Sequence, residues 1–277
     1  MTRAFTGMLD DQVMKMLTNG VDFESFFDEV ARSSKRALLL DYDGTLAPFS
    51  IDRDRAFPYP GVRDLLDTIV EAGHTRVVVI SGRSVESLVP LLGLQKRPEL
   101  WGSHGMERMD QDGNIVCADI PKEAAQGIVS EHEWMQKQGL MGHCEIKPFS
   151  LAFHVRGLDQ SVAEGLIHRV LDRWSRMFRG LGLFVHEFDG GIELRPKGFH
   201  KGHAVMSILD EMGNKTAAAY LGDDNTDEDA FKSIKGRGIG ILVREEFRPT
   251  AADAWLSPPE QLLQFLKCWH DAAEGKE

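Results

Sequence analysis

The chain has few cysteines and no long apolar run. Its three cysteines, Cys117, Cys144 and Cys268, are scattered and odd in number, so they indicate neither a disulfide framework nor the paired spacing of a zinc site. No stretch approaches the roughly 20 apolar residues that a membrane-spanning helix requires. Residues 1–11 include acidic side chains and lack the apolar core of a signal peptide. We therefore expect a protein of the reducing cytoplasm without membrane spans.

Basic residues are also scarce relative to acidic ones. The chain has 32 lysines and arginines against 43 aspartates and glutamates, a formal net charge of −11 at pH 7. Proteins that bind nucleic acids or anionic membranes normally carry a basic surface, so we expect neither partner. An anionic small substrate stays compatible with this charge, because a bound cation can reverse the potential at one site. The length of 277 residues suits one large or two modest globular domains.

Short apolar runs alternate with helical patterns at both ends of the chain. Strands are predicted at 35–43, 76–80, 100–102, 217–221 and 239–243, with an edge strand at 254–256 and helices at 61–72, 84–92, 202–212, 228–234 and 259–272. This alternation predicts an α/β fold with a doubly wound, mostly parallel sheet. Residues 1–34 predict one or two helices, because apolar residues recur there at helical spacing: Met8, Leu9, Val13, Met14, Leu17, Phe23, Phe26, Phe27 and Val30.

The pattern changes in the middle of the chain. Strands at 114–118, 143–147, 151–156, 183–188 and 192–195 surround helices at 123–137 and 160–179, which is typical of antiparallel α+β structure. We therefore predict N-terminal helices at 1–34, a core at 35–108 and 197–277, and an inserted α+β domain at 109–196.

Four groups of polar residues stand at expected strand ends or helix starts. They are Asp41 and Asp43 with Gly44-Thr45, Ser81-Gly82-Arg83, Lys201, and Gly222-Asp223-Asp224 with Asp227. Singly, each has an ordinary interpretation as a turn, a helix cap or a solvated charge. Together they place two acidic pairs, a hydroxyl and a lysine at the carboxyl ends of strands, where α/β sheets bind ligands. Adjacent aspartates repel without a cation, and oxygen ligands suit Mg²⁺. The combination indicates metal-assisted phosphoryl transfer.

These four groups resemble the motifs of the haloacid dehalogenase superfamily of phosphohydrolases. A wider set of segments is similar to trehalose-6-phosphate phosphatases: Asp41 to Pro48, Ser81 to Arg83, His104 to Glu107, Glu145 to Lys147, Ser150 to Arg156, Glu193 to Pro196, Lys201-Gly202, and Gly222 to Glu228. The resemblance runs from about residue 35 to the C-terminus. It implies a Rossmann-like haloacid dehalogenase core with an inserted cap, and hydrolysis of trehalose 6-phosphate.

The resemblance also implies roles for individual residues. Asp41 would be the nucleophile that forms an aspartyl-phosphate, and Asp43 would protonate the leaving sugar oxygen and then activate water. Thr45 would steer Asp43, Ser81 would hydrogen-bond the phosphoryl group, and Lys201 would balance its charge.

Mg²⁺ is the implied cofactor. Asp41, the backbone carbonyl of Asp43 and Asp223 would hold it, with Asp224 as a further ligand; Asp227 is the alternative to Asp224, as a ligand or as an orienting group.

The inserted domain would select the substrate. Strand alternation places polar residues on one face of its strands: Glu145 and Lys147, His154 and Arg156, Glu193 and Arg195. The alternative is a solvated face of an antiparallel sheet. The resemblance implies sugar recognition by Glu145, Lys147 and Glu193, with Arg156 binding the substrate or bracing the carboxylates. Arg83, His104 and Glu107 are further expected substrate contacts.

Three other functions stay open at this point. A phosphoacceptor signalling domain would also use a strand-end aspartate, although Asp43 and the inserted domain would then have no purpose. A catalytically silent sugar-phosphate-binding subunit would not need all four motifs. A phosphatase for another glycosyl phosphate, such as sucrose phosphate or glucosyl-phosphoglycerate, is the nearest enzymatic alternative. A trehalose-phosphate synthase is a candidate partner.

Overall fold

The computed structural model of the chain describes residues 14–18, 22–50, 52–177, 181–188 and 190–275. It divides into two compact units, the first formed by Met1–Val116 with His200–Glu277 and the second by Cys117–Phe199. Residues 109–116, predicted in the inserted domain, lie in the first unit because strands β5 and β6 extend its sheet, and residues 197–199, predicted in the core, lie in the second unit.

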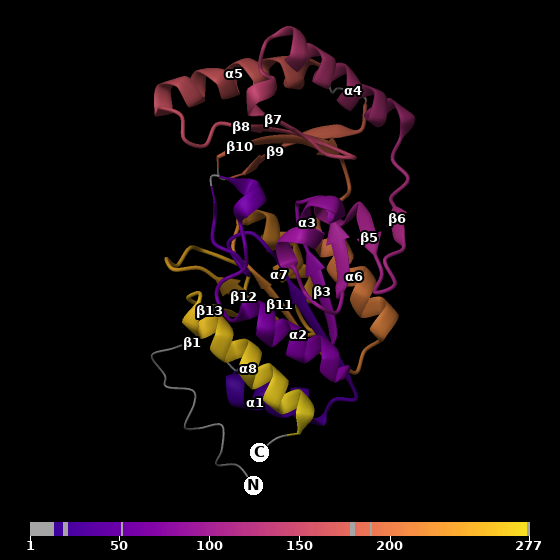
Figure 1. Cartoon of the computed structure of the whole chain (residues 1–277), viewed down its shortest axis with the longest axis vertical. Helices are drawn as coiled ribbons and strands as arrows, with labels where there is room; N and C mark the ends of the chain where they lie inside the picture. Colours follow the sequence, from indigo (N-terminus) through magenta and orange to yellow (C-terminus); the bar gives the residue numbers. More distant parts are fainter. Residues whose placement is uncertain (1–13, 19–21, 51, 178–180, 189, 276–277) are drawn as a thin grey trace. The chain divides into compact units, whose positions relative to one another are not determined.

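A nine-stranded sheet forms the centre of the first unit (Figure 1). Its strand order is β1 (Met14–Met16), β13 (Ala254–Leu256), β12 (Ile239–Val243), β11 (Thr216–Gly222), β2 (Lys35–Leu40), β3 (Arg76–Ile80), β4 (Glu99–Gly102), β5 (Glu107–Met109) and β6 (Ile115–Cys117). The pairings from β13 to β4 are all parallel, whereas β1 pairs antiparallel with β13, and β5 with β4. The expected doubly wound, mostly parallel sheet is confirmed.

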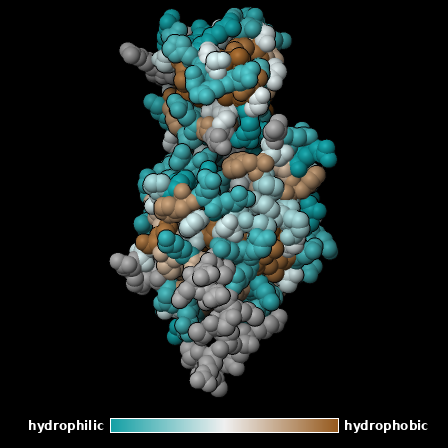
Figure 2. Space-filling model, turned by 90° about the vertical axis from the view of Figure 1, so that its left-hand side faces the viewer, coloured by the Kyte–Doolittle hydropathy of each residue, from teal (hydrophilic) through white to brown (hydrophobic). Residues whose placement is uncertain are grey.

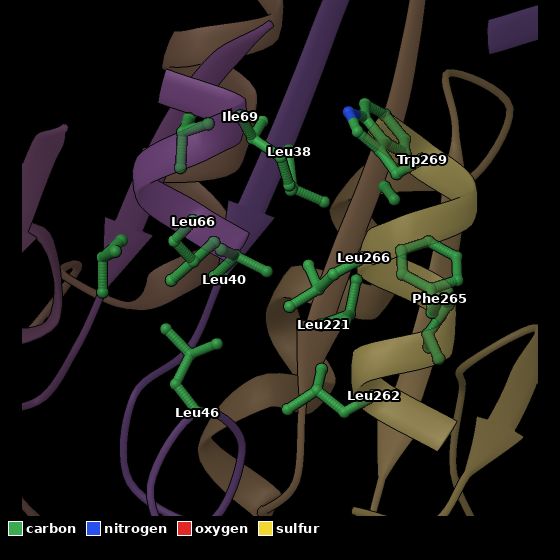
Figure 3. Close-up of a cluster of buried hydrophobic side chains, with 14 of the residues drawn as sticks. Leu38, Leu40, Leu46, Leu66, Ile69, Leu221, Leu262, Phe265, Leu266 and Trp269 are labelled. Carbon is green, nitrogen blue, oxygen red and sulfur yellow. The ribbon is translucent and has the colours of Figure 1, made fainter. Parts of the chain in front are cut away.

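Helices cover both faces of this sheet. Along β2, Leu38 and Leu40 join one buried cluster, while Ala37 and Leu39 join another. The first cluster contains side chains of α1 (Phe23–Arg32), α2 (Val62–Ala72), α3 (Val85–Leu92) and α8 (Glu260–Glu274), and the second those of α6 (Lys201–Met212) and α7 (Glu228–Ile234). Figure 3 shows Leu38, Leu40 and Leu221 between α2 and α8. A strand that is apolar on both faces is what parallel sheets with two helical layers require.

Two sequence predictions are wrong at the ends of the chain. Met14–Met16 forms a strand rather than a helix, because alternation places Met14 and Met16 together against the core and exposes Lys15. A short apolar run fits both the helical period of about 3.6 residues and the strand period of about 2, so its spacing could not decide between helix and strand. Residues 8, 9 and 13 of that predicted helix lie outside the described residues. The second wrong prediction is the edge position of β13, because β1 pairs along its outer side.

The second unit is an antiparallel sheet covered by two helices on one face. The strand order is β7 (Cys144–Ile146), β8 (Leu151–His154), β10 (Gly191–Pro196) and β9 (Leu183–Phe188). Helices α4 (Lys122–Lys137) and α5 (Gln160–Met177) pack their apolar residues against Leu151, Phe153, Ile192 and Leu194. The alternate residues of these strands point to the other face of the sheet.

No helix in the described part of the chain is long and apolar enough to cross a bilayer. On the face drawn in Figure 2, hydrophilic residues predominate and hydrophobic ones appear in small groups.

Candidate active site

The carboxyl ends of β2 and β11 bring two aspartates to one edge of the sheet. Asp41 directly follows β2 and Asp223 directly follows β11, and these neighbouring parallel strands pair Leu40 with Leu221. The chain continues from β2 to β3 and β4 on one side and from β11 to β12 and β13 on the other. This point, where the winding direction changes, is where such sheets bind ligands.

Three carboxylates and one ammonium meet at this edge. Asp41, Asp223 and Asp227 each offer a carboxylate oxygen, and these oxygens lie within 4.8 Å of one another. Lys201 Nζ lies 2.6 Å from Asp41 Oδ1 and 2.8 Å from Asp227 Oδ1. All four side chains are almost completely buried. Lys201 is the first residue of α6, so helix packing determines its position.

Two glycines permit this close packing. Gly44 has a φ of 83°, and a Cβ there would lie 2.2 Å from Asp223 Oδ2. A Cβ on Gly202 would lie 2.5 Å from the Asp229 carbonyl oxygen, so a larger residue would force α6 away from α7. Any side chain at Gly44 would therefore displace the Asp223 carboxylate.

The electrostatic balance of this cluster is unfavourable without a further cation. Burial, followed by the charge of Asp227, raises the pKa of Asp41 to about 7, although Lys201 opposes the shift. Burial and the charges of Asp41 and Asp227 also raise the pKa of Asp223 well above its usual value. Burial would lower the pKa of Lys201, but Asp227 and Asp41 outweigh it and raise that pKa. One ammonium thus faces three carboxylates.

Asp227 is the carboxylate whose oxygens are already occupied. Its Oδ1 accepts from Lys201 and from the Tyr220 hydroxyl at 2.5 Å, and its Oδ2 accepts from the backbone N–H groups of Asp223 (3.1 Å) and Asp224 (3.0 Å). The arrangement suits a residue that orients Lys201 and the acidic turn. The Asp224 carboxylate instead accepts from the Asn225 N–H as an N-cap.

The donor set fits a divalent cation. Both carboxylate oxygens of Asp223 are buried, and within the described residues neither has a hydrogen-bond partner. Such orphaned acceptors are costly unless a proton or a cation satisfies them. All ligand atoms available here are oxygens, which suits Mg²⁺.

Asp43 forms an ion pair with Arg83. The Arg83 Nε and Nη2 atoms each lie 2.7 Å from one carboxylate oxygen of Asp43, and Nη1 donates to the Arg53 carbonyl at 2.8 Å. Arg83 was expected to contact substrate, and that contact stays a prediction. Its guanidinium makes a bidentate contact with Asp43, the proposed acid/base residue.

Ser81, His104 and Glu107 meet around a turn after β4. Ser81 directly follows β3, and its carbonyl accepts from the His104 N–H at 2.9 Å. Ser103 and His104 both have positive φ, at 49° and 57°, a conformation that costs energy in non-glycine residues. The Glu107 carboxylate accepts from the Ser103 hydroxyl at 2.5 Å and from the Val85 N–H at 3.4 Å. Glu107 therefore ties this turn to the start of α3, and its predicted substrate contact stays a prediction.

The second unit holds its own polar cluster. Lys147 Nζ lies 2.8 Å from Glu193 Oε1, and the Ser150 hydroxyl donates to the same oxygen at 2.6 Å. His154 Nε2 lies 3.0 Å from Glu145 Oε2. Register pairs Ala152 with both Glu145 and Glu193, which places the two carboxylates in one row on the face opposite the helices. The cluster joins Glu145, Lys147 and Glu193, whose role in sugar recognition stays a prediction. Arg156 is exposed and lies beside Gly190.

Comparison with known proteins gives the family. The trehalose-phosphatase family model matches residues 39–254, which is most of the chain and includes both motif groups of aspartates.

The chain belongs to the trehalose-phosphatase family.

Its curated relatives are named as phosphatases, a class of phosphoric monoester hydrolases. A probable trehalose-phosphate phosphatase 3 of Oryza sativa subsp. japonica is 30% identical over 275 residues, which cover 88% of this chain and 72% of that protein. A probable trehalose-phosphate phosphatase C of Arabidopsis thaliana is 29% identical over 266 residues, with 87% and 79% covered.

Solved structures share the fold of this family member. The C-terminal domain of C. albicans trehalose-6-phosphate phosphatase superimposes with a TM-score of 0.77 at 22% identity, covering 92% of this chain and 98% of that one. A haloacid dehalogenase-like hydrolase from Bacteroides thetaiotaomicron gives a TM-score of 0.60 at 15% identity, covering 84% and 97%. The expected haloacid dehalogenase fold is confirmed.

Sequence reasoning missed the roles of three residues that support the acidic turn of this trehalose-phosphatase family member, although one of them, Glu228, lies at the end of a predicted motif. Tyr220 lies inside a buried strand, where its ring looks like a core residue and only its contact with Asp227 shows the role of the hydroxyl. Arg248, from the loop after β12, contacts the Asp223 carbonyl, and Glu228, which directly follows the turn, contacts Arg248. An isolated arginine in a polar loop carries no local signal, so spacing alone could not have found Arg248.

Proposed function

We propose that the chain is a Mg²⁺-dependent phosphatase that hydrolyses trehalose 6-phosphate to trehalose and phosphate through an aspartyl-phosphate. The observation that carries this proposal is the buried cluster of Asp41, Lys201 and Asp223 in a member of the trehalose-phosphatase family. The names of the curated relatives support the choice of substrate.

The cation would be held by Asp41, Asp223 and the backbone carbonyl of Asp43. When bound, it would neutralise phosphate charge so that a carboxylate can approach the phosphorus. The orphaned oxygens of Asp223 are the observation that supports this assignment. Asp224 is half-buried and serves as a cap, so we place it farther from the cation than Asp223.

Asp41 would act as the nucleophile. Lys201 holds Oδ1 at 2.6 Å, whereas Oδ2 has a longer contact of 3.5 Å with the Thr45 hydroxyl. We therefore assign the attack to Oδ2, which would form a bond to phosphorus as the bond from phosphorus to the sugar oxygen breaks. Lys201 would balance the charge of the transferred group, and Ser81 would hydrogen-bond it.

Asp43 would move the protons. As an acid it would protonate the departing sugar oxygen, and as a base it would take a proton from the water that cleaves the aspartyl-phosphate. The bidentate contact with Arg83 holds the Asp43 carboxyl group in one orientation. Both proton transfers would depend on that orientation.

The second unit would recognise the sugar. Glu145, Lys147 and Glu193 offer carboxylates and an ammonium that can bond several hydroxyl groups, and their mutual contacts hold them in place. Arg83, His104, Glu107 and Arg156 remain proposed substrate contacts. We further propose a cytoplasmic setting and a trehalose-phosphate synthase as partner, with no nucleic acid and no membrane.

A substrate panel tests this function. Purified protein with Mg²⁺ is expected to release phosphate from trehalose 6-phosphate faster than from sucrose phosphate or glucosyl-phosphoglycerate. Preference for one of the other two would refute the substrate and leave the reaction type standing. Asp41→Asn should lower turnover by at least about 10³-fold, and undiminished turnover would refute the covalent mechanism.

A further inference from the structure

The side chain of Arg248 hydrogen-bonds to the backbone of the acidic turn after β11, at Asp223 and Asp224. Arg248 lies in the loop that follows β12, and its Nε atom donates to the carbonyl oxygen of Asp223 at 3.1 Å. Its Nη2 atom donates to the carbonyl oxygen of Asp224 at 2.8 Å. One planar guanidinium thus holds two consecutive peptide groups, which a single ammonium cannot do in the same geometry.

Glu228 holds the guanidinium in turn. Arg248 Nη1 lies 2.6 Å from Glu228 Oε1, which also accepts from the Thr250 hydroxyl at 2.8 Å. The other carboxylate oxygen of Glu228 accepts from the Ala251 N–H at 2.8 Å. Both side chains are largely buried, at 17% and 19% exposure. The pair is electrically neutral as a unit and ties the loop to the first residue of α7.

The Asp223 carboxylate depends on its backbone for orientation. Within the described residues, no hydrogen-bond donor contacts its two carboxylate oxygens. Its N–H donates to Asp227 at 3.1 Å, and its carbonyl accepts from Arg248. The peptide groups on both sides of Asp223 are therefore fixed by side chains from other segments.

We propose that Arg248, held by Glu228, is a positioning residue that sets the Asp223 carboxylate for the metal ion. The inference rests on the proposed Mg²⁺ site. Groups that orient metal ligands without touching the metal typically change affinity by about 10–100-fold. Because Glu228 neutralises the guanidinium, the effect comes from geometry rather than from net charge.

Calorimetric titration of Mg²⁺ alone into the metal-free full-length protein tests the inference. Arg248→Met keeps the apolar stem, and Arg248→Lys keeps the charge but cannot reach both carbonyls. We expect each to raise the Kd for Mg²⁺ about 10–100-fold, and turnover to recover at saturating Mg²⁺. Arg237→Met, which removes an ion pair with Asp210 at the surface, is the matched control and should leave the Kd within about twofold.

The titration distinguishes a failure of the proposed Mg²⁺ site from a failure of the positioning role of Arg248. A wild-type protein that binds no Mg²⁺ would overturn the metal assignment together with this inference. Binding by the wild type with an unchanged Kd in both Arg248 variants would overturn the inference alone, even if the unfolding temperature fell. If Arg248→Met does not fold, Arg248→Lys decides the matter.

Discussion

Neutralising Asp223 should stabilise the metal-free protein while abolishing its response to Mg²⁺. Both carboxylate oxygens of Asp223 are buried without a hydrogen-bond partner, beside the charges of Asp41 and Asp227. A buried unsatisfied group costs about 1–3 kcal/mol, and a charged one more. Asp223→Asn removes the charge and nearly preserves the shape, so we expect a gain of about 2 kcal/mol. For a unit of this size that is a rise of about 4–8 °C in the unfolding midpoint.

The gain should grow with pH. A carboxyl whose pKa is raised on folding contributes stability below its unfolded value, and loses it as pH rises through the folded value. The pKa of Asp41 is raised from 3.8 to about 7, and that of Asp223 is also raised well above its usual value. The wild-type protein should therefore lose stability as the pH rises from about 4 to 7. Asp223→Asn should lose less over the same range.

Thermal unfolding in EDTA at pH 5 and pH 8 measures this difference. Added Mg²⁺ at 100 times its Kd should stabilise the wild type by about 2.7 kcal/mol and leave Asp223→Asn almost unchanged. Asp229→Asn is the matched control, because that carboxylate is 51% exposed on α7. A lower midpoint for Asp223→Asn in EDTA at pH 8, or an equal Mg²⁺ response in both proteins, would refute the reasoning.

Three further predictions concern activity. Gly44→Ala should weaken Mg²⁺ binding and lower turnover at least about tenfold, because the new Cβ would lie 2.2 Å from Asp223 Oδ2. Calorimetry measures the Mg²⁺ affinity and phosphate release measures the turnover. Wild-type values for both would contradict the proposed packing. Arg83→Lys should slow hydrolysis of alkyl phosphates more than hydrolysis of p-nitrophenyl phosphate, because p-nitrophenolate is a good leaving group that needs no proton from Asp43. Equal slowing of both substrates would argue against a role for the Arg83–Asp43 contact in proton transfer. Glu193→Ala should raise the KM for trehalose 6-phosphate at least about tenfold and barely affect p-nitrophenyl phosphate. Equal losses would exclude Glu193 from sugar recognition.

The local patterns of the sequence were sufficient for the parallel strands of the sheet and for the helices that cover it. Runs such as 76–80 are apolar on both faces and end at polar residues, so their type and bounds follow from burial. The same reasoning failed at Met14–Met16, where the partner strand β13 lies far along the chain and decides the conformation.

The acidic residues of the site could be predicted, but their division of labour could not. Asp224 and Asp227 are equally plausible from spacing after a strand. Only the structure shows that Asp227 is saturated by Lys201, Tyr220 and two backbone N–H groups. Arg83 likewise has one sequence signal, a cation near a phosphate motif, and two possible targets. Its bidentate contact with Asp43 is a tertiary fact that no local pattern encodes.

The pairing of β2 with β11 has a consequence for synthesis of the chain on the ribosome. Asp41 and Lys201 are 160 residues apart in the sequence. At a translation rate of about 5–20 residues per second, Lys201 is therefore synthesised roughly 10–30 s after Asp41. The second unit, a continuous stretch from Cys117 to Phe199, is complete before then. During that interval β11 has not been synthesised, so β2 lacks this partner strand. We expect chaperones to bind a nascent chain in this state.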